Sequence, residues 1–216
     1  MMFGKIFGKT KTDEKLVTPS ILGLRIGCSF EVDPLILKLL ENDLVTQNIS
    51  TTHIIQAAGK VELDDALLYR FYSDDEGFLQ VVAQGGTADE NVIDVKLYHY
   101  FDTLDVSSER DWDKLLYQDI GRPTYQLQEH IYQRVWTATS DYHKPVHMSE
   151  TTYDNQGMTS VTDQFTMLFE RPIADDRTES LFLSAEEKEE PAGSLSRCFV
   201  ISTGITLTST EITIHG

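Results

Sequence analysis

The feature that most constrains the fold is a run of four short apolar segments between residues 54 and 101. They cover residues 54–63, 66–72, 78–84 and 92–101, and the polar breaks between them are short. In the first and last segments apolar and polar residues alternate, which is the period of a strand with one buried face. Because parallel neighbours need a crossover of about a dozen residues or more, such short breaks predict antiparallel pairing.

The remaining chain predicts more strands and two short helices. Asp33 is a suitable N-cap for a helix over residues 34–42, with Pro34 at its first position. Ser108 can cap a second helix over residues 109–118. Further strands are predicted within residues 21–30 and over 125–139, 158–170, 181–183, 197–202, 205–207 and 211–214. The expected fold class is α+β, predominantly an antiparallel β-sheet of about eight to ten strands with two short helices.

The domain organisation expected from these segments is a flexible leader, residues 1–20, followed by a single α+β domain, residues 21–216. Residues 184–194 are acidic and contain proline and glycine, which predicts a mobile loop inside that domain. In the leader, Phe3, Ile6 and Phe7 have helical spacing among lysines and could contact a membrane surface. The alternative is that these three side chains pack on the domain.

The net charge of the chain limits the classes of partner that it can bind. The formal net charge is -17 at pH 7, so the surface repels phosphate backbones and we expect no nucleic-acid binding. Such a surface suits a soluble protein or one with a basic partner. Cys28 and Cys198 lie in apolar runs and are predicted to be buried thiols of a reducing compartment. Without an apolar run near the roughly 20 residues of a membrane span, the expected location is cytoplasmic.

Two arginines stand out among the candidate site residues. Arg70 and Arg134 lie on otherwise apolar or aromatic strands, where a guanidinium must find a partner. They could hold an anionic group together, or each could form a structural ion pair. Asp74 and Asp75 could hold a cation or serve in acid–base chemistry, or could simply be turn residues. The candidate ligand-binding set is Arg70, Tyr72, Asp74, Asp75, Arg134 and Trp136.

The spacing of His143 and His147 is the nearest approach to a metal-binding motif. Pro145 between them disfavours a helix, and on a strand the two residues stand about 13 Å apart, too far for one zinc ion. A turn at Pro145 could still bring the two histidines together. The chain also has no nucleophile-elbow, phosphate-loop or dinucleotide-binding motif. We therefore expect no metal, no cofactor and a non-catalytic role, with no catalytic residue to name.

Several sequence pieces together resemble a family of bacterial proteins, the YjfK-like family. These pieces are the MFGK start, LYRFYSDDEGFLQVVAQGG, YQRVW, FTMLFERP and the Gly-Ile-x-Leu ending. The resemblance implies no established activity and no catalytic residues to carry over. It also implies companionship with phage-shock-protein-A-like membrane-stress proteins and with glutathionylspermidine-synthase-like ligases.

Two function hypotheses follow. The first is a non-catalytic protein-interaction module linked to envelope or membrane stress, with a phage-shock-protein-A-like partner. The alternative is a small-molecule binder or hydrolase for a polyamine, using Arg70, Asp74 and Asp75, because an acidic protein attracts cations.

Overall fold

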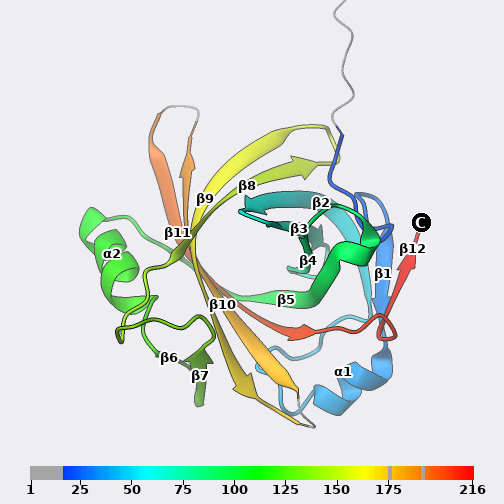
Figure 1. Ribbon diagram of the computed structural model, residues 1–216, viewed down its shortest axis with the longest axis horizontal. Helices are drawn as coiled ribbons and strands as arrows, with labels where there is room; N and C mark the ends of the chain where they lie inside the picture. The colour runs from blue at the N-terminus through cyan, green and yellow to red at the C-terminus, as the bar shows by residue number, and fades with distance from the viewer. Residues whose placement is uncertain (1–16, 175–176, 191–192) are drawn as a thin grey trace, which may run out of the picture.

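The structure is a computed structural model that describes residues 17–174, 177–190 and 193–216. In these residues twelve strands form one sheet (Figure 1). The strands are β1 (Ser29–Val32), β2 (Thr52–Leu63), β3 (Ala66–Ser73), β4 (Gly77–Gln84), β5 (Val92–Asp105), β6 (Thr124–Leu127), β7 (His130–Arg134), β8 (Val146–Asp154), β9 (Thr159–Pro172), β10 (Thr178–Glu189), β11 (Leu195–Thr206) and β12 (Ile212–His215).

Four helical elements accompany the strands in the part of the chain that the structure describes. Helix α1 (Pro34–Leu40) is capped by Asp33, whose side chain accepts a hydrogen bond from the Leu35 N–H. Helix α2 (Glu109–Lys114) is capped by Ser108 and continues into a π-helical turn, η2 (Leu115–Asp119). A 3₁₀ turn, η1 (Asp89–Asn91), precedes β5. Both α-helices begin at the residues that the capping pattern predicts.

Eight of the strands close into a barrel. The order β2-β3-β4-β5-β11-β10-β9 is antiparallel throughout, and β8 pairs with both β9 and β2. The first residues of β2 pair instead with β1, which in turn pairs with β12. Consequently β1 and β12 leave the barrel at one point, and the β6–β7 hairpin leaves it from the end of β9.

The outside of the barrel is covered by two apolar clusters. One contains Phe30, Leu37 and Phe71 and lies beneath β1, β12 and α1. The other contains Trp112, Ile120 and Phe169 and lies beneath α2 and the β6–β7 hairpin. Figure 1 shows α1 and α2 on different sides of the barrel. Since alternate residues of each strand point to opposite faces, the remaining side chains fill the interior.

The expectation of a predominantly antiparallel β-structure with two short helices is confirmed, and its specific form is a closed barrel. Twelve strands are present in the described residues, more than the eight to ten we expected. The predicted strand over residues 125–139 is instead the β6–β7 hairpin, whose turn includes Gln128 with φ of 52°. Strand β8 was not predicted, because its residues are largely polar.

Residues 184–189, which we predicted as part of a loop, form the second half of β10. The acidic and polar side chains of these residues indicated a loop. In the structure Ser184 and Glu186 instead belong to the polar face of the strand. Of the leader predicted over residues 1–20, residues 1–16 with Phe3, Ile6 and Phe7 lie outside the described part of the chain. Both cysteines are free thiols, with Cys28 buried and Cys198 partly buried.

None of the helices in the described ranges has the length and apolar character that a membrane span requires.

Candidate functional site

Arg70 lies at the centre of a hydrogen-bonded network inside the barrel. Its Nη1 donates to Glu150 Oε2 at 2.6 Å and to Gln164 Oε1 at 2.7 Å, and its Nε donates to Gln80 Oε1 at 3.0 Å. These partners come from β8, β9 and β4, so the guanidinium of β3 reaches across the interior. The alternative we left open for Arg70, a buried ion pair, is the arrangement present here.

Tyr72 belongs to the same network. Its hydroxyl donates to Glu150 Oε1 at 2.6 Å, and burial together with the Glu150 charge holds the pKa of Tyr72 above its ordinary value. The rings of Phe78 and Phe182 lie 5.6 and 5.2 Å from the Arg70 guanidinium. The donors of Arg70 are therefore directed at protein acceptors and its faces at aromatic rings, which leaves little of it for a ligand.

Arg134 and Trp136 lie elsewhere. Arg134, at the end of β7, donates to the backbone carbonyls of Gly121, Trp136 and Asp141. It thus ties together the loops around the β6–β7 hairpin. Trp136 is partly buried and packs against apolar clusters at the barrel wall. The structure does not bring this pair together with Arg70.

Asp74 and Asp75 lie in the β3–β4 hairpin, where both side chains accept hydrogen bonds from backbone N–H groups. Asp74 Oδ1 accepts from the Ile54 N–H at 2.8 Å, and Asp75 Oδ2 accepts from the Ser50 N–H at 3.0 Å. The hairpin is therefore fastened to the start of β2 and to the segment before it. We call that segment, residues 44–51, the covering loop.

Beneath the covering loop, Asp75 meets two histidines that sequence reasoning did not single out. His53 is the second residue of β2 and His99 lies in β5, both on the outer face of the barrel. Asp75 Oδ2 lies 3.4 Å from His99 Nε2 and 3.9 Å from His53 Nδ1. One ligand atom from each of the three residues lies within 4.8 Å of the other two.

The imidazoles of this cluster are buried without hydrogen-bond partners. His53 is 0% exposed and His99 is 5% exposed. Within the described residues, both ring nitrogens of His53 and the Nε2 of His99 lack a hydrogen-bond partner. His53 Nδ1 lies too far from Asp75 for a hydrogen bond, and His99 Nε2 approaches the carboxylate at 3.4 Å without hydrogen-bond alignment. Burial of a polar group without a partner costs free energy, so these atoms call for an explanation.

Burial also sets the protonation state of the cluster. It lowers the pKa of both His53 and His99, and the negative charge of Asp75 opposes the change only in part. Phe30 stacks on His53 with 4.7 Å between ring centroids. At neutral pH both imidazoles are therefore neutral, which is the form that ligates metals.

The distances suit a metal ion. Bonds of about 2.0–2.2 Å in a tetrahedral arrangement put ligand atoms about 3.3–3.6 Å apart. The 3.4 Å separation of Asp75 and His99 falls in that range, and the 3.9 Å separation from His53 needs only a small side-chain adjustment. Two histidines and one carboxylate form the ligand set of several zinc sites and of non-haem iron sites.

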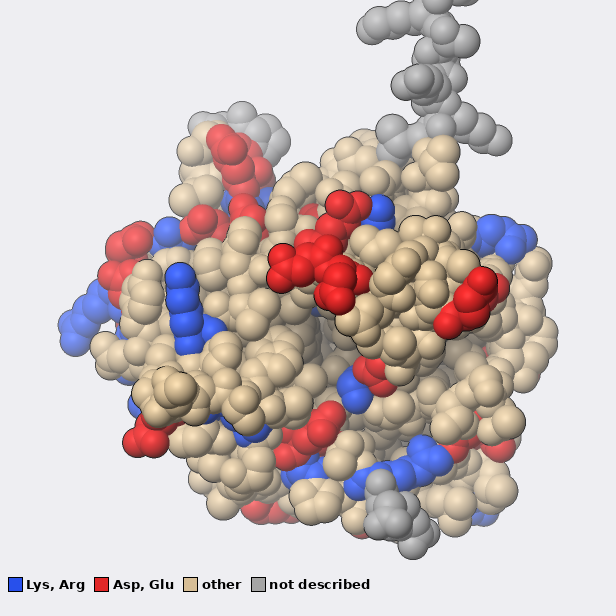
Figure 2. Space-filling model, in the orientation of Figure 1, with Lys and Arg blue, Asp and Glu red and all other residues tan. Residues whose placement is uncertain are grey.

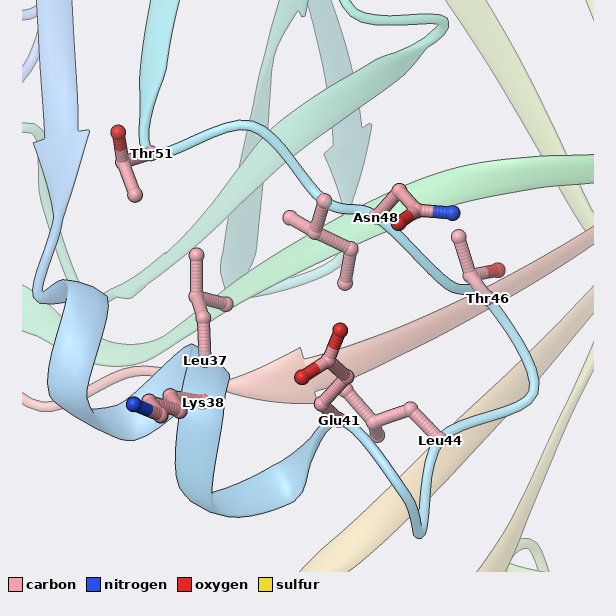
Figure 3. Close-up of a pocket in the computed structure, with 8 residues that line it drawn as sticks. Leu37, Lys38, Glu41, Leu44, Thr46, Asn48 and Thr51 are labelled. Atoms are coloured by element: carbon pink, nitrogen blue, oxygen red, sulfur yellow. The ribbon is translucent and has the colours of Figure 1, made fainter.

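A cleft of about 210 Å³ leads from the surface to this cluster. Its walls include the acidic hairpin residues Asp74, Asp75 and Glu76 on one side and covering-loop residues 46–49 on another, with His99 and Tyr100 between them. On its other side the covering loop borders a pocket of about 180 Å³ against α1, shown in Figure 3. Charged side chains of both signs lie on the face of the molecule shown in Figure 2.

The sequence pattern pointed to other histidines. His143 Nδ1 lies 2.6 Å from the Lys144 carbonyl oxygen, and the exposed His147 Nε2 lies 3.0 Å from Asp163 Oδ1. The two therefore have separate partners. His53 and His99 escaped notice because only the pairing of β2, β3, β4 and β5 brings them to one hairpin. No local motif in the sequence carries that information.

Comparison with known proteins places the chain in a family. It is 26% identical over 217 residues to the "Uncharacterized protein YjfK" of Escherichia coli (strain K12), covering 99% of this chain and 98% of that protein. No solved structure matches it. A family model described as "Protein of unknown function (DUF2491)" matches residues 2–213, as the resemblance to YjfK-like proteins predicted. The chain therefore belongs to the DUF2491 family.

Proposed function

We propose that this protein binds one divalent transition-metal ion through His53, Asp75 and His99. The observation that carries the proposal is the pair of buried, neutral imidazoles with unpartnered nitrogens facing one carboxylate. A metal ion would bind His99 Nε2 and one nitrogen of His53, and would leave the other His53 nitrogen without a partner. The proposal departs from our expectation of no metal, which considered only local histidine motifs.

The alternative for such a cluster is a protonated histidine paired with Asp75. Two features oppose it. Burial lowers the pKa of both histidines, and each imidazole would have to be desolvated as a cation. Moreover, His53 is separated from Asp75 by 3.9 Å, which is longer than a hydrogen bond. A metal ion bridges that distance without protonation.

The test is zinc binding to the metal-free full-length chain at pH 7.5, followed by calorimetry and by thermal unfolding. We expect one zinc ion per chain and a higher unfolding temperature, because a ligand of the native state stabilises it. His99→Gln should abolish both effects. The matched control is His147→Gln, which removes an exposed imidazole beside a carboxylate and should change neither. Equal zinc binding by His99→Gln and wild type would refute the proposal.

A second candidate is the protein-interaction module. What supports it is an apolar groove of about 490 Å³ between β5 and β12, bordered by Asp89 and Asp94, in which Ile93 is 63% exposed. With a net charge of -17, such a groove suits a basic, amphipathic partner segment. Binding of a purified phage-shock-protein-A-like protein, lost in Ile93→Glu but kept in Val161→Glu, would support this function. Val161 is an exposed apolar residue of β9, with 54% of its surface exposed.

The polyamine alternative also keeps a specific observation in its favour. Asp74 and Glu76 are exposed carboxylates at the cleft, and cations are attracted to such a surface. Arg70 is excluded from that site by its interior position. A thermal-shift titration with spermidine tests this function, and an unchanged midpoint at millimolar spermidine would count against it.

A further inference from the structure

We propose that the metal at His53, Asp75 and His99 keeps one coordination position open toward the acidic cleft, and that this position takes a small neutral donor ligand in preference to an anion. This inference rests on the proposed metal binding. A metal site with an open position can exchange ligands. It differs in this from a closed structural site, in which four protein ligands surround the metal.

The first argument is the direction from which the ligands come. His53 is fully buried, stacks on Phe30 and does not border the cleft. His99 and Asp75 both line the cleft. A metal held by these three residues is therefore covered on its inner side by His53, and its uncovered side points into the cleft.

The second argument is the number of ligands. Within the described residues, the group of closely placed histidine, cysteine and acidic side chains has three members. The adjacent carboxylate, Asp74, already accepts a hydrogen bond from the Ile54 N–H at 2.8 Å. Zinc takes four ligands and non-haem iron takes more, so at least one position is left for an exogenous donor.

The third argument is charge. A divalent metal with two neutral imidazoles and one carboxylate carries a net charge of about +1. Asp74 and Glu76 also line the cleft and add two negative charges, so the metal site and these two carboxylates together carry a net charge of about -1. An anion therefore enters against repulsion, whereas a neutral donor such as an imidazole or a water molecule does not. The cleft volume of about 210 Å³ admits a ligand of this size.

Cobalt supplies the readout, because its visible absorption changes with its ligands. The full-length chain is loaded with one equivalent of Co²⁺ and titrated with imidazole and, separately, with azide. We expect a saturable change in the cobalt spectrum with imidazole, and at least fivefold weaker binding of azide. Metal analysis after desalting should show that the cobalt stays on the protein.

A substitution of Glu76 tests the charge argument. Glu76 is exposed and belongs to the cleft wall but not to the ligand set, so Glu76→Gln should tighten azide binding to the cobalt-loaded protein by about two- to fivefold. The loss of the same negative charge should weaken cobalt binding, because the carboxylate attracts the cation. A cobalt spectrum that neither titrant changes would show a closed site and overturn the inference, with metal binding intact. Azide binding as tight as imidazole would overturn the preference for a neutral donor. An absence of cobalt binding would refute the proposed function itself.

Discussion

Arg70 and Glu150 form a 2.6 Å ion pair across the interior of the barrel, although β2 lies between their strands β3 and β8. They are 80 residues apart in the sequence, and each side chain is 2% exposed. Tyr72 and Gln164 also bond to Glu150, so the carboxylate of β8 is a shared acceptor for donors from two strands, β3 and β9. This network links the three strands through the interior of the barrel.

Removing one partner of the pair should be costly. Glu150→Gln leaves the Arg70 charge buried without its counter-charge, so we expect the free energy of unfolding to fall by about 3–5 kcal/mol. Urea denaturation at pH 7 measures the change. The double variant Arg70→Met/Glu150→Leu removes both charges and should recover part of the loss. A loss below about 1 kcal/mol in Glu150→Gln would contradict the importance of the pair.

Gly59 on β2 provides the space in which Glu150 lies. A Cβ at Gly59 would stand 1.7 Å from Glu150 Oε1, so the carboxylate would have to leave its position. We expect Gly59→Ala to lower the free energy of unfolding by about 1–3 kcal/mol through overpacking. In a Glu150→Ala background the same change meets no carboxylate and should cost less. Equal costs in both backgrounds would show that Gly59 does not act through Glu150.

The sequence predicts the four central strands and both helix starts, because each depends on neighbouring residues. Alternation and short breaks suffice for β2 to β5, and an aspartate before a proline suffices for α1. The sequence also shows that Arg70 needs a partner. It does not identify Glu150, because that residue lies in β8, whose polar side chains do not resemble a buried strand.

The same physical cause explains the wrong loop prediction at residues 184–189. The interior of this barrel holds polar side chains beside aromatic ones, so a strand can carry glutamate and serine on its inner face and still be ordered. The candidate metal site is hidden for another reason. Asp75 was among the candidate residues, but its histidine neighbours come from separate strands, and only the barrel's pairing brings them together.

Cys198 should be an unreactive thiol at ordinary pH. Burial and the nearby charges of Glu186 and Asp105 raise its pKa to about 11 from an ordinary value of 9.0. Because the thiolate is the reactive form, we expect alkylation by iodoacetamide at pH 8 to be roughly ten- to a hundredfold slower than for a free thiol, and to rise with pH up to about 11. Mass spectrometry of a Cys28→Ser variant measures the rate at this thiol alone.

Glu186→Gln removes one of the charges that oppose the Cys198 thiolate. The variant should lower the pKa of Cys198 and speed alkylation at pH 8. Half-maximal reactivity near pH 9 in the folded wild type would contradict the assigned burial of this thiol.

The covering loop should control how fast a metal reaches His53. It is held by Thr46 Oγ1, 2.7 Å from Thr203 Oγ1, and by the Val45 N–H, which donates to Glu179 Oε1 at 2.8 Å. The pocket in Figure 3 gives the loop space on its outer side. Thr46→Val removes the first bond, so we expect faster amide hydrogen exchange in residues 44–51 and faster zinc association in stopped-flow measurements.

The matched control for this change is Thr210→Val, which removes a threonine pair of similar length, Thr208 Oγ1 to Thr210 Oγ1 at 3.1 Å, away from the covering loop. It should leave both rates unchanged. Bound zinc should in turn slow exchange of the Ser50 amide, because Asp75 then holds the metal and Ser50 in one arrangement. Zinc association that is equally fast in Thr46→Val and wild type, despite faster loop exchange, would show that the metal enters through the cleft without loop opening.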